Sequence, residues 1–251
     1  MSRPLTRTNF NSSKLTRLLA DLALLDAAES GHAFAEKLGL WVGFTDAIAL
    51  RAAHDTAHDT FASKQSGEIC DAGEEFTRVK TQMMLAITSR HSASGTRSRM
   101  SLPVPKVGVS YEDAVSFEPY RRYYLAHQRD VELQIQSLRA KVRNLLGKTS
   151  PALRQLADLD AAFDTILSDR ESKLLSRLPS LLEQRFKQLL TAHKLARVDI
   201  DEIDNPDLWM KPKGWLSRFF SDLQAVQLAE LDMRLQPTEG LIEAFQNEID
   251  R

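Results

Sequence analysis

Two histidines four residues apart, His54 and His58, are the first residues whose types and spacing could do chemistry. On a helix this spacing places both imidazoles on one face, as a pair of zinc ligands requires. Asp55 follows the first histidine where the helical zinc motif has a glutamate as general base, and the sequence announces no third ligand. A metal-dependent hydrolase centred on His54 and His58 is therefore one hypothesis, and a solvated helical face is the interpretation that we favour.

A stretch without acidic residues, from Thr77 to Ser110, is the second candidate. Its six cations are Arg78, Lys80, Arg90, Arg97, Arg99 and Lys106. Such a segment can bind phosphates, anionic lipid headgroups or an acidic protein face, and the acids between Asp199 and Asp207 of the same chain form one such face. Aromatic residues for base stacking are missing after Phe76. Nucleic-acid binding through residues 90–106, with the last four cations as contacts, is thus an alternative and not our main expectation.

Other reaction centres have no signature in the sequence. We find no Gly-rich phosphate loop and no nucleophile elbow, and Asp71 beside Cys70 disfavours a reactive thiolate. We therefore predict that the protein is not an enzyme and that it needs no cofactor.

Composition narrows the class of protein. The 251 residues include 33 Lys and Arg against 34 Asp and Glu, which removes the global basic bias of a dedicated nucleic-acid binder. One cysteine excludes an intramolecular disulfide framework and suits a reducing cytoplasm. The longest run without a charged residue is nine residues, Thr81 to Ser89, whereas a membrane span needs about 20. We expect a soluble cytoplasmic protein with no membrane span.

The elements that must position these residues are helices. The chain has 36 Leu and 27 Ala against 10 Val and 9 Ile, so helix-favouring residues outnumber strand-favouring ones by about three to one. This composition predicts an all-α fold. Glycines and prolines are few and fall mostly between segments with helical periodicity, where they act as breaks.

A long antiparallel helical hairpin is the most specific structural prediction. Two apolar stripes with helical spacing run over about 120–146 and 151–178, and Gly147 to Pro151 separates them with a glycine, a hydroxyl cap and a helix-starting proline. So short a connection makes the two helices antiparallel, with a coiled-coil-like seam packed against shorter helices. Residues whose numbers sum to about 297 should then face each other, such as Ile135 and Phe163. Pro119 and Pro179 stand at one height, where the hairpin should end.

One layer of this seam is polar. His127 falls opposite Arg170, with Glu171 adjacent, and a polar layer inside a helical seam commonly fixes register at some cost in stability. The alternatives are that both side chains are solvated at the edge, or that His127 senses pH. Side chains that flank the seam, namely Leu133, Leu167 and Leu175, also allow a homo-oligomer.

The chain is expected to divide at two linkers. We predict an N-terminal helical region over 1–90, a basic linker over 91–110, the hairpin over 111–197, an acidic linker over 198–213, and C-terminal helices over 214–251 that pack on the rest. Within the last region, Gln236 and Pro237 should close one helix and Thr238 should begin a short final one.

Four stretches resemble one family. They are RTNFNSS at 7–13, FEPYRRYY at 117–124, SPALRQL at 150–156 and AELDMRLQP at 229–237. Together they are similar to a proteobacterial domain-of-unknown-function family, number 3348, over almost the whole chain. This resemblance brings no catalytic residue. It implies genes that lie beside envelope proteins similar to motor-type proton channels and OmpA-like peptidoglycan binders, and hence a cytoplasmic helical accessory.

Function follows from these patterns as an expectation. We predict a non-enzymatic helical interaction or scaffold protein whose hairpin or charged linkers bind a protein partner, with the cytoplasmic part of a membrane complex as the partner that the resemblance implies. The nucleic-acid hypothesis and the metal-dependent hydrolase hypothesis are the alternatives.

Overall fold

The computed structural model describes residues 13–22, 24, 43–55, 71–88, 103, 115–197 and 206–249. Most of these residues are helical, with no strand among them, so the prediction of an all-α fold is confirmed. The helices are α1 (Lys14–Asp21), α3 (Phe44–Asp55), α4 (Asp71–Thr88), α6 (Glu118–Thr149), α7 (Pro151–Leu175), α8 (Leu178–Leu195), α9 (Pro206–Trp209) and α10 (Trp215–Ile249).

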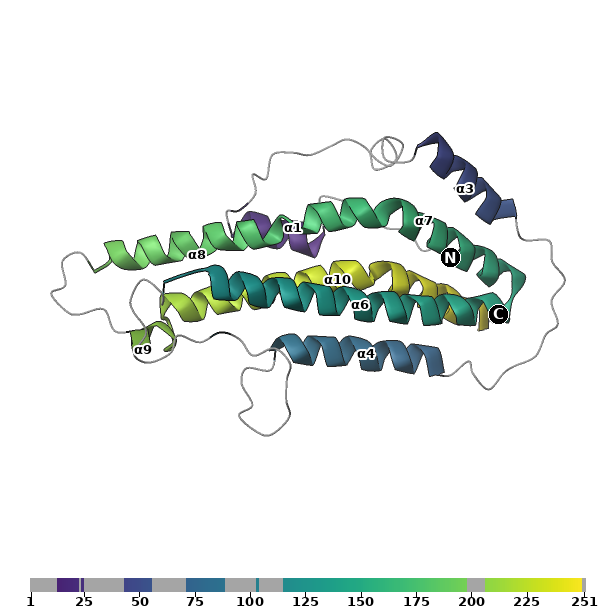
Figure 1. Ribbon diagram of the computed structural model, residues 1–251. Helices are drawn as coiled ribbons and strands as arrows, with labels where there is room; N and C mark the ends of the chain where they lie inside the picture. The colour runs from purple at the N-terminus through teal and green to yellow at the C-terminus, as the bar shows by residue number, and fades with distance from the viewer. Residues whose placement is uncertain are drawn as a thin grey trace, which may run out of the picture.

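The long helices form a bundle around α6 and α10 (Figure 1). These two helices lie side by side and run in the same direction. α7 and α8 run back along one side of them, and α4 runs back along the other. α1 packs on α10, and α3 lies outside α7.

The predicted hairpin is confirmed. Ser150 alone separates α6 from α7, and its backbone is extended (φ −149°, ψ 159°). The Ser150 hydroxyl accepts a 3.2 Å hydrogen bond from the Leu153 amide, and Pro151 begins α7 as expected. The regular hairpin ends where the two prolines stand, because α6 begins at Glu118 and α7 stops at Leu175, just before Pro179 in α8.

The seam of α7 is rotated from its predicted face. All predicted α6 positions from Tyr120 to Val142 are buried, but Leu174 on α7 is 55% exposed and Ala157 and Leu175 are buried instead. The physical reason is that Asp160 and Asp164 turn toward α6, where arginines pair with them, so the face of α7 with the most leucines is not the one in contact.

The prediction of a helix break at Pro237 is wrong. α10 is one continuous helix from Trp215 to Ile249, with this proline inside it. A proline in a helix interior removes one backbone hydrogen bond and costs about 3 kcal/mol. Leu235, Thr238 and Leu241 around it are buried on one face, and their packing offsets that cost.

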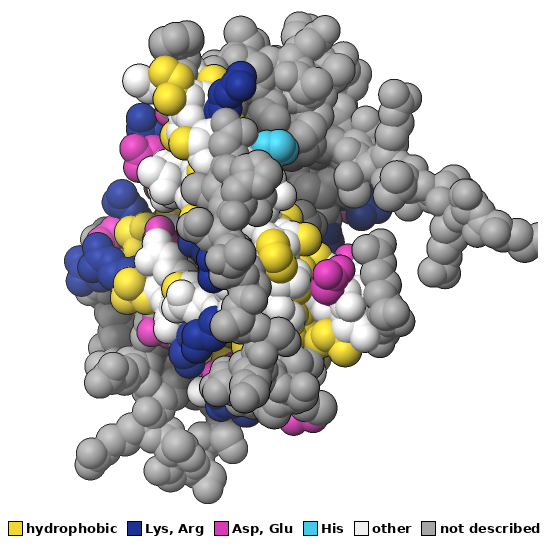
Figure 2. All heavy atoms as spheres, turned by 90° about the vertical axis from the view of Figure 1, so that its right-hand side faces the viewer, with side chains coloured by type: hydrophobic (Ala, Val, Ile, Leu, Met, Phe, Trp, Pro, Cys, Tyr) yellow, Lys and Arg dark blue, Asp and Glu magenta, His cyan; other side chains and the backbone are white. Residues whose placement is uncertain are grey.

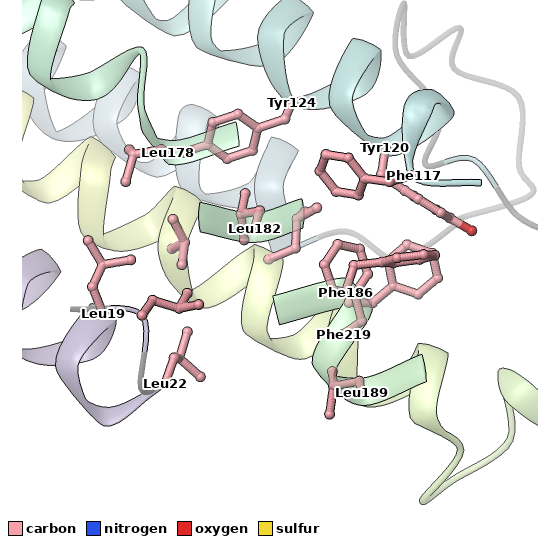
Figure 3. Packing of buried hydrophobic residues seen from close by; sticks show 14 of the residues in the cluster. Leu19, Leu22, Phe117, Tyr120, Tyr124, Leu178, Leu182, Phe186, Leu189 and Phe219 are labelled. Atoms are coloured by element: carbon pink, nitrogen blue, oxygen red, sulfur yellow. The ribbon is translucent and has the colours of Figure 1, made fainter. Parts of the chain in front are cut away.

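The buried apolar residues form two cores. The first lies where α1, the start of α6, α8 and the start of α10 meet, and Figure 3 shows Tyr120 of α6, Phe186 of α8 and Phe219 of α10 converging there. Ring centroids of Phe186 and Phe219 are 5.1 Å apart in an edge-to-face arrangement. The second core joins α4, α6, α7 and the end of α10 around Leu146 and Leu235.

Part of the predicted acidic linker lies within the described residues. Pro206–Trp209 forms α9, and Trp209 is buried against the first core. The turn into α10 passes through Lys213, whose φ is 76°, and Gly214, where a side chain would meet the Trp209 carbonyl oxygen at 2.1 Å. Residues 198–205, which carry most of the acids, lie outside the described residues.

Candidate functional site

A group of polar side chains lies at the boundary of the two cores, and we call it the central polar layer. Its members come from three helices: Tyr124 and Gln128 of α6, Glu171 of α7, and Glu230 and Arg234 of α10. The Glu230 carboxylate accepts hydrogen bonds from the Tyr124 hydroxyl (2.5 Å), the Gln128 amide (2.8 Å) and Arg234 Nε (3.0 Å). Arg234 also reaches Glu171, 3.4 Å away.

Burial dominates the electrostatics of this layer. The side chains of Glu230 and Arg234 are almost fully buried, so each depends on the other to compensate its charge. Burial raises the pKa of Tyr124 well above its usual value, and the negative charge of Glu230 acts in the same direction. Tyr124 therefore stays a neutral donor, and the layer links α6 to α10 through charge-assisted hydrogen bonds.

Gln128 also connects the layer to the junction of α7 and α8. Pro179 has no N–H, so the Leu175 carbonyl, four residues earlier, lacks its helical donor. The side-chain amide of Gln128 lies 3.4 Å from that carbonyl oxygen while it binds Glu230. One glutamine thus supports both the helix break and the buried carboxylate.

A second polar network fixes the hairpin. Arg139 and Arg143, one turn apart on α6, face Asp160 and Asp164, one turn apart on α7. Arg139 binds both oxygens of Asp160 (2.6 and 2.9 Å) and also Asp164 (2.7 Å). Arg143 binds the same two carboxylates at 2.6 and 2.8 Å. The network is closed on itself and mostly shielded from water, so it favours one register of the hairpin.

The two predicted polar-layer residues lie at the height expected but not in a shared contact. His127 is buried and lines a hollow between α4 and α6. Its burial lowers the pKa of the imidazole, against the opposing charges of Glu230 and Asp130. Arg170 is half-buried, and its Nη1 atom has no hydrogen-bond partner among the described residues. Their role in setting the register stays a prediction.

Sequence reasoning missed the residues that carry the polar contacts. Pairing within the hairpin cannot place Glu230 and Arg234, because the register of α10 against α6 is set by tertiary packing alone. A signal for the second network was present: Arg139 with Arg143, and Asp160 with Asp164, repeat at four residues on facing helices.

The surface beside α4 carries two hollows. One, of about 760 Å³, lies over α4 and reaches Gln246 of α10, with Leu85 at its wall. The other, of about 490 Å³, lies between α4 and α6 and has Leu133 at its wall. Gln82 lines both. Leu85 is 59% exposed and Leu133 is 60% exposed, so each hollow presents a large apolar side chain to solvent.

Charges elsewhere on the described surface are mixed. The end of the bundle where α6 turns into α7 faces the viewer in Figure 2, and it shows cationic, anionic and hydrophobic side chains interspersed. Leu175, which we expected at an oligomer contact, is buried by its own chain and is not available for one. Leu167 is half-buried on α7.

The remaining candidates fall mostly outside the described residues. His58 and the four basic-segment contacts Arg90, Arg97, Arg99 and Lys106 are among those not described. His54 is exposed at the end of α3. Within the described part of the chain, no three His, Cys, Asp or Glu side chains gather as a metal site would need. The helices that are described include none with the length and apolarity to cross a bilayer.

Fold and contacts together define a helical bundle whose buried polar groups link its helices to one another. By sequence, residues 1–247 match the family model described as protein of unknown function (DUF3348), so the chain belongs to that family. The comparison with curated proteins and the comparison with solved structures gave no match.

Proposed function

We propose that this protein is a non-enzymatic interaction protein that binds another protein through the surface beside α4. The observation that carries the proposal is the pair of hollows that flank α4, each with an exposed leucine at its wall. Exposed apolar side chains that lie near each other on one surface can form the apolar centre of a protein interface.

The use of the buried polar groups supports a structural role for them. Glu230 has three donors, two from α6 and one from its own helix α10, and Asp160 has two arginines from α6, so all of these partners belong to the same bundle. Carboxylates whose partners all come from their own bundle link its helices to one another, which is a structural use. The feature that we assign to partner binding is therefore the exposed apolar surface beside α4.

The partner that we propose is the cytoplasmic part of an envelope complex with motor-type channel and OmpA-like proteins. This proposal rests on the family and includes a cytoplasmic location. Its test is photo-crosslinking in native cells, with a photoreactive amino acid placed at Leu85 or at Leu133. An adduct that contains an integral membrane protein at both positions is the expected result.

A matched control is the same amino acid at Gln188, which is exposed on α8 on the far side of the bundle from α4. No such adduct should form there. Adducts of equal yield at all three positions, or only soluble proteins at Leu85 and Leu133, would contradict the proposal.

The two alternative functions stay hypotheses, since their residues lie largely outside the described part. A gel shift that weakens steeply with salt would support nucleic-acid binding by residues 90–106. Stoichiometric zinc in the purified protein, lost on changing His54 and His58 to alanine, would support the hydrolase.

A further inference from the structure

The outer side of α7, away from α6, is covered by a helix that is barely buried. α3 lies against the first half of α7 (Figure 1), and the Gln155 side chain donates a 2.6 Å hydrogen bond to the His54 carbonyl at the end of α3. None of the described α3 side chains is buried. Leu50 and Ala53 are only half-buried, and Ile48 is exposed. The cover that α3 provides is therefore thin.

Helical spacing identifies the α7 side chains on the covered face. Leu159, Ala162 and Ile166 follow Gln155 at steps of four, three and four residues, so all lie on one face of the helix. This face is roughly opposite Ala157, which is buried in the second core. The three side chains are half-buried. α7 thus offers an apolar stripe on the side where α3 lies.

Toward the end of α7 the same face becomes cationic. Arg170 and Lys173 continue the spacing from Ile166, with Asp169 as the acid beside them. Arg170 Nη1 is buried and has no hydrogen-bond partner among the described residues. α3 is about 18 Å long, whereas about 22 Å separate Gln155 from Arg170 along α7, at 1.5 Å per residue. A longer helix would fit this face better than α3 does.

We propose that α3 is a displaceable cover and that the outer face of α7 binds an amphipathic helix of a partner protein. The partner helix places apolar side chains over Leu159 and Ile166 and an acidic end beside Arg170. Three observations support this occupant. The face already holds a helix, and its centre is apolar. Beyond the length of α3 the face carries Arg170 and Lys173, and Arg170 Nη1 has no hydrogen-bond partner among the described residues.

The energetics favour exchange of one helix for the other. A helix of 12 residues is marginal in water by itself, and a segment with few buried contacts opens at low cost. A partner helix with a full apolar stripe gains more from burial than α3 does. The inference rests on the proposed interaction role, but not on the envelope partner.

Two synthetic helical peptides test the inference. Both carry leucines at positions one, five, eight and twelve, and one ends in three glutamates where the other ends in three lysines. Fluorescence anisotropy with the full chain should show binding of the glutamate peptide and at least about tenfold weaker binding of the lysine peptide. Arg170→Glu should reverse this preference.

Weakening the cover should strengthen binding. Leu50→Asp places a charge at a half-buried position of α3 and so weakens the cover. A larger fraction of the protein is then ready to bind, and the dissociation constant of the glutamate peptide should fall about fivefold. Leu195→Asp, at an exposed position at the end of α8 away from α3, is the matched control and should leave that constant unchanged. Hydrogen exchange should show α3 amides losing protection when the peptide binds.

Failure of this inference is separate from failure of the proposed function, because the peptide assay involves no cell component and the crosslinks at Leu85 involve no α7 residue. Equal affinity for both peptides, absence of binding to the Leu50→Asp variant, or α3 amides as protected as those of α6 would each overturn it.

Discussion

Glu230 is a carboxylate that the fold has removed from water and surrounded with donors. Tyr124, Gln128 and Arg234 satisfy it from two helices, so its charge is compensated inside the bundle. A buried pair of this kind adds less to stability than its contacts suggest, but breaking it by removing one partner is costly. Removal of Glu230 should therefore lower the free energy of unfolding by more than the intact pair contributes to it.

Replacement of Glu230 by alanine tests this asymmetry. The change leaves the Arg234 guanidinium buried without its nearest carboxylate, so the free energy of unfolding should fall by about 3–5 kcal/mol in urea titration. Glu243→Ala, at an exposed position of the same helix, should change it by less than about 0.5 kcal/mol. Equal effects of the two substitutions would show that the central polar layer is not a tight link.

A single residue, His127, also makes the stability of the folded protein depend on pH. Burial depresses its folded-state pKa below the usual 6.5, so the folded protein holds fewer protons than the unfolded chain. The stability that the neutral imidazole of His127 contributes to the folded state is fully present above pH 6.5, and it is lost as the pH falls through the folded-state pKa. Glu171 opposes this trend, because burial raises its pKa above 4.5.

The measurement is the thermal midpoint between pH 7.5 and pH 5, with His127→Gln as the comparison. The wild-type midpoint should fall more over this range than that of the variant, which has nothing to titrate at position 127. Parallel curves would mean that the imidazole is as easily protonated in the folded protein as in the unfolded chain.

At the scale of the helix, Pro237 is a local helix-breaking signal that packing overrides, because α10 continues through it. Pro237→Ala restores the N–H that the Met233 carbonyl lacks in α10, so it should stabilise the protein by about 1–3 kcal/mol, less any gain in unfolded-chain entropy. A rise in the urea midpoint checks this. A fall would mean that the fold depends on a distortion of α10 at this proline.

Two glycines, Gly214 directly before α10 and Gly240 inside it, make a matched pair. A methyl group at Gly214 would lie 2.1 Å from the Trp209 carbonyl oxygen, whereas nothing lies within 4 Å of one at Gly240. Gly214→Ala should therefore destabilise the protein by several kcal/mol, and Gly240→Ala should stabilise its helix by about 0.5–1 kcal/mol. Circular dichroism melts of both variants separate the two effects.

Helix positions were predictable where the sequence repeats at helical spacing and where a turn is short. The α6 stripe and the Ser150 connection needed no knowledge of the rest of the chain. Which face of α7 meets α6 was not predictable from leucines, because paired charges such as Arg139 with Asp160 can lie in a seam. Pro237 was misread because the burial that offsets it comes from distant helices. Of the central polar layer, the sequence analysis identified only Glu171. Glu230 belongs to a third helix, which pairing within the hairpin cannot place.

For the whole molecule, the question is whether two cores make two folding units. The central polar layer separates them, but α6 and α10 run unbroken through both, and Tyr124 and Leu146 are buried on one helix in different cores. A continuous helix that is packed at both ends couples the cores, because unfolding either end exposes the other. We therefore expect one cooperative transition.

Two leucine substitutions test that coupling, in a Trp41→Phe background so that fluorescence comes from Trp209 and Trp215 in the first core. Leu146→Ala in the second core and Leu182→Ala in the first each remove a fully buried side chain, at a cost of about 2–5 kcal/mol. For each variant, the urea midpoint measured by fluorescence and the one measured by circular dichroism should fall by the same amount. If Leu146→Ala moves the circular dichroism curve but leaves the tryptophan curve in place, the polar layer is a boundary between two units that unfold separately.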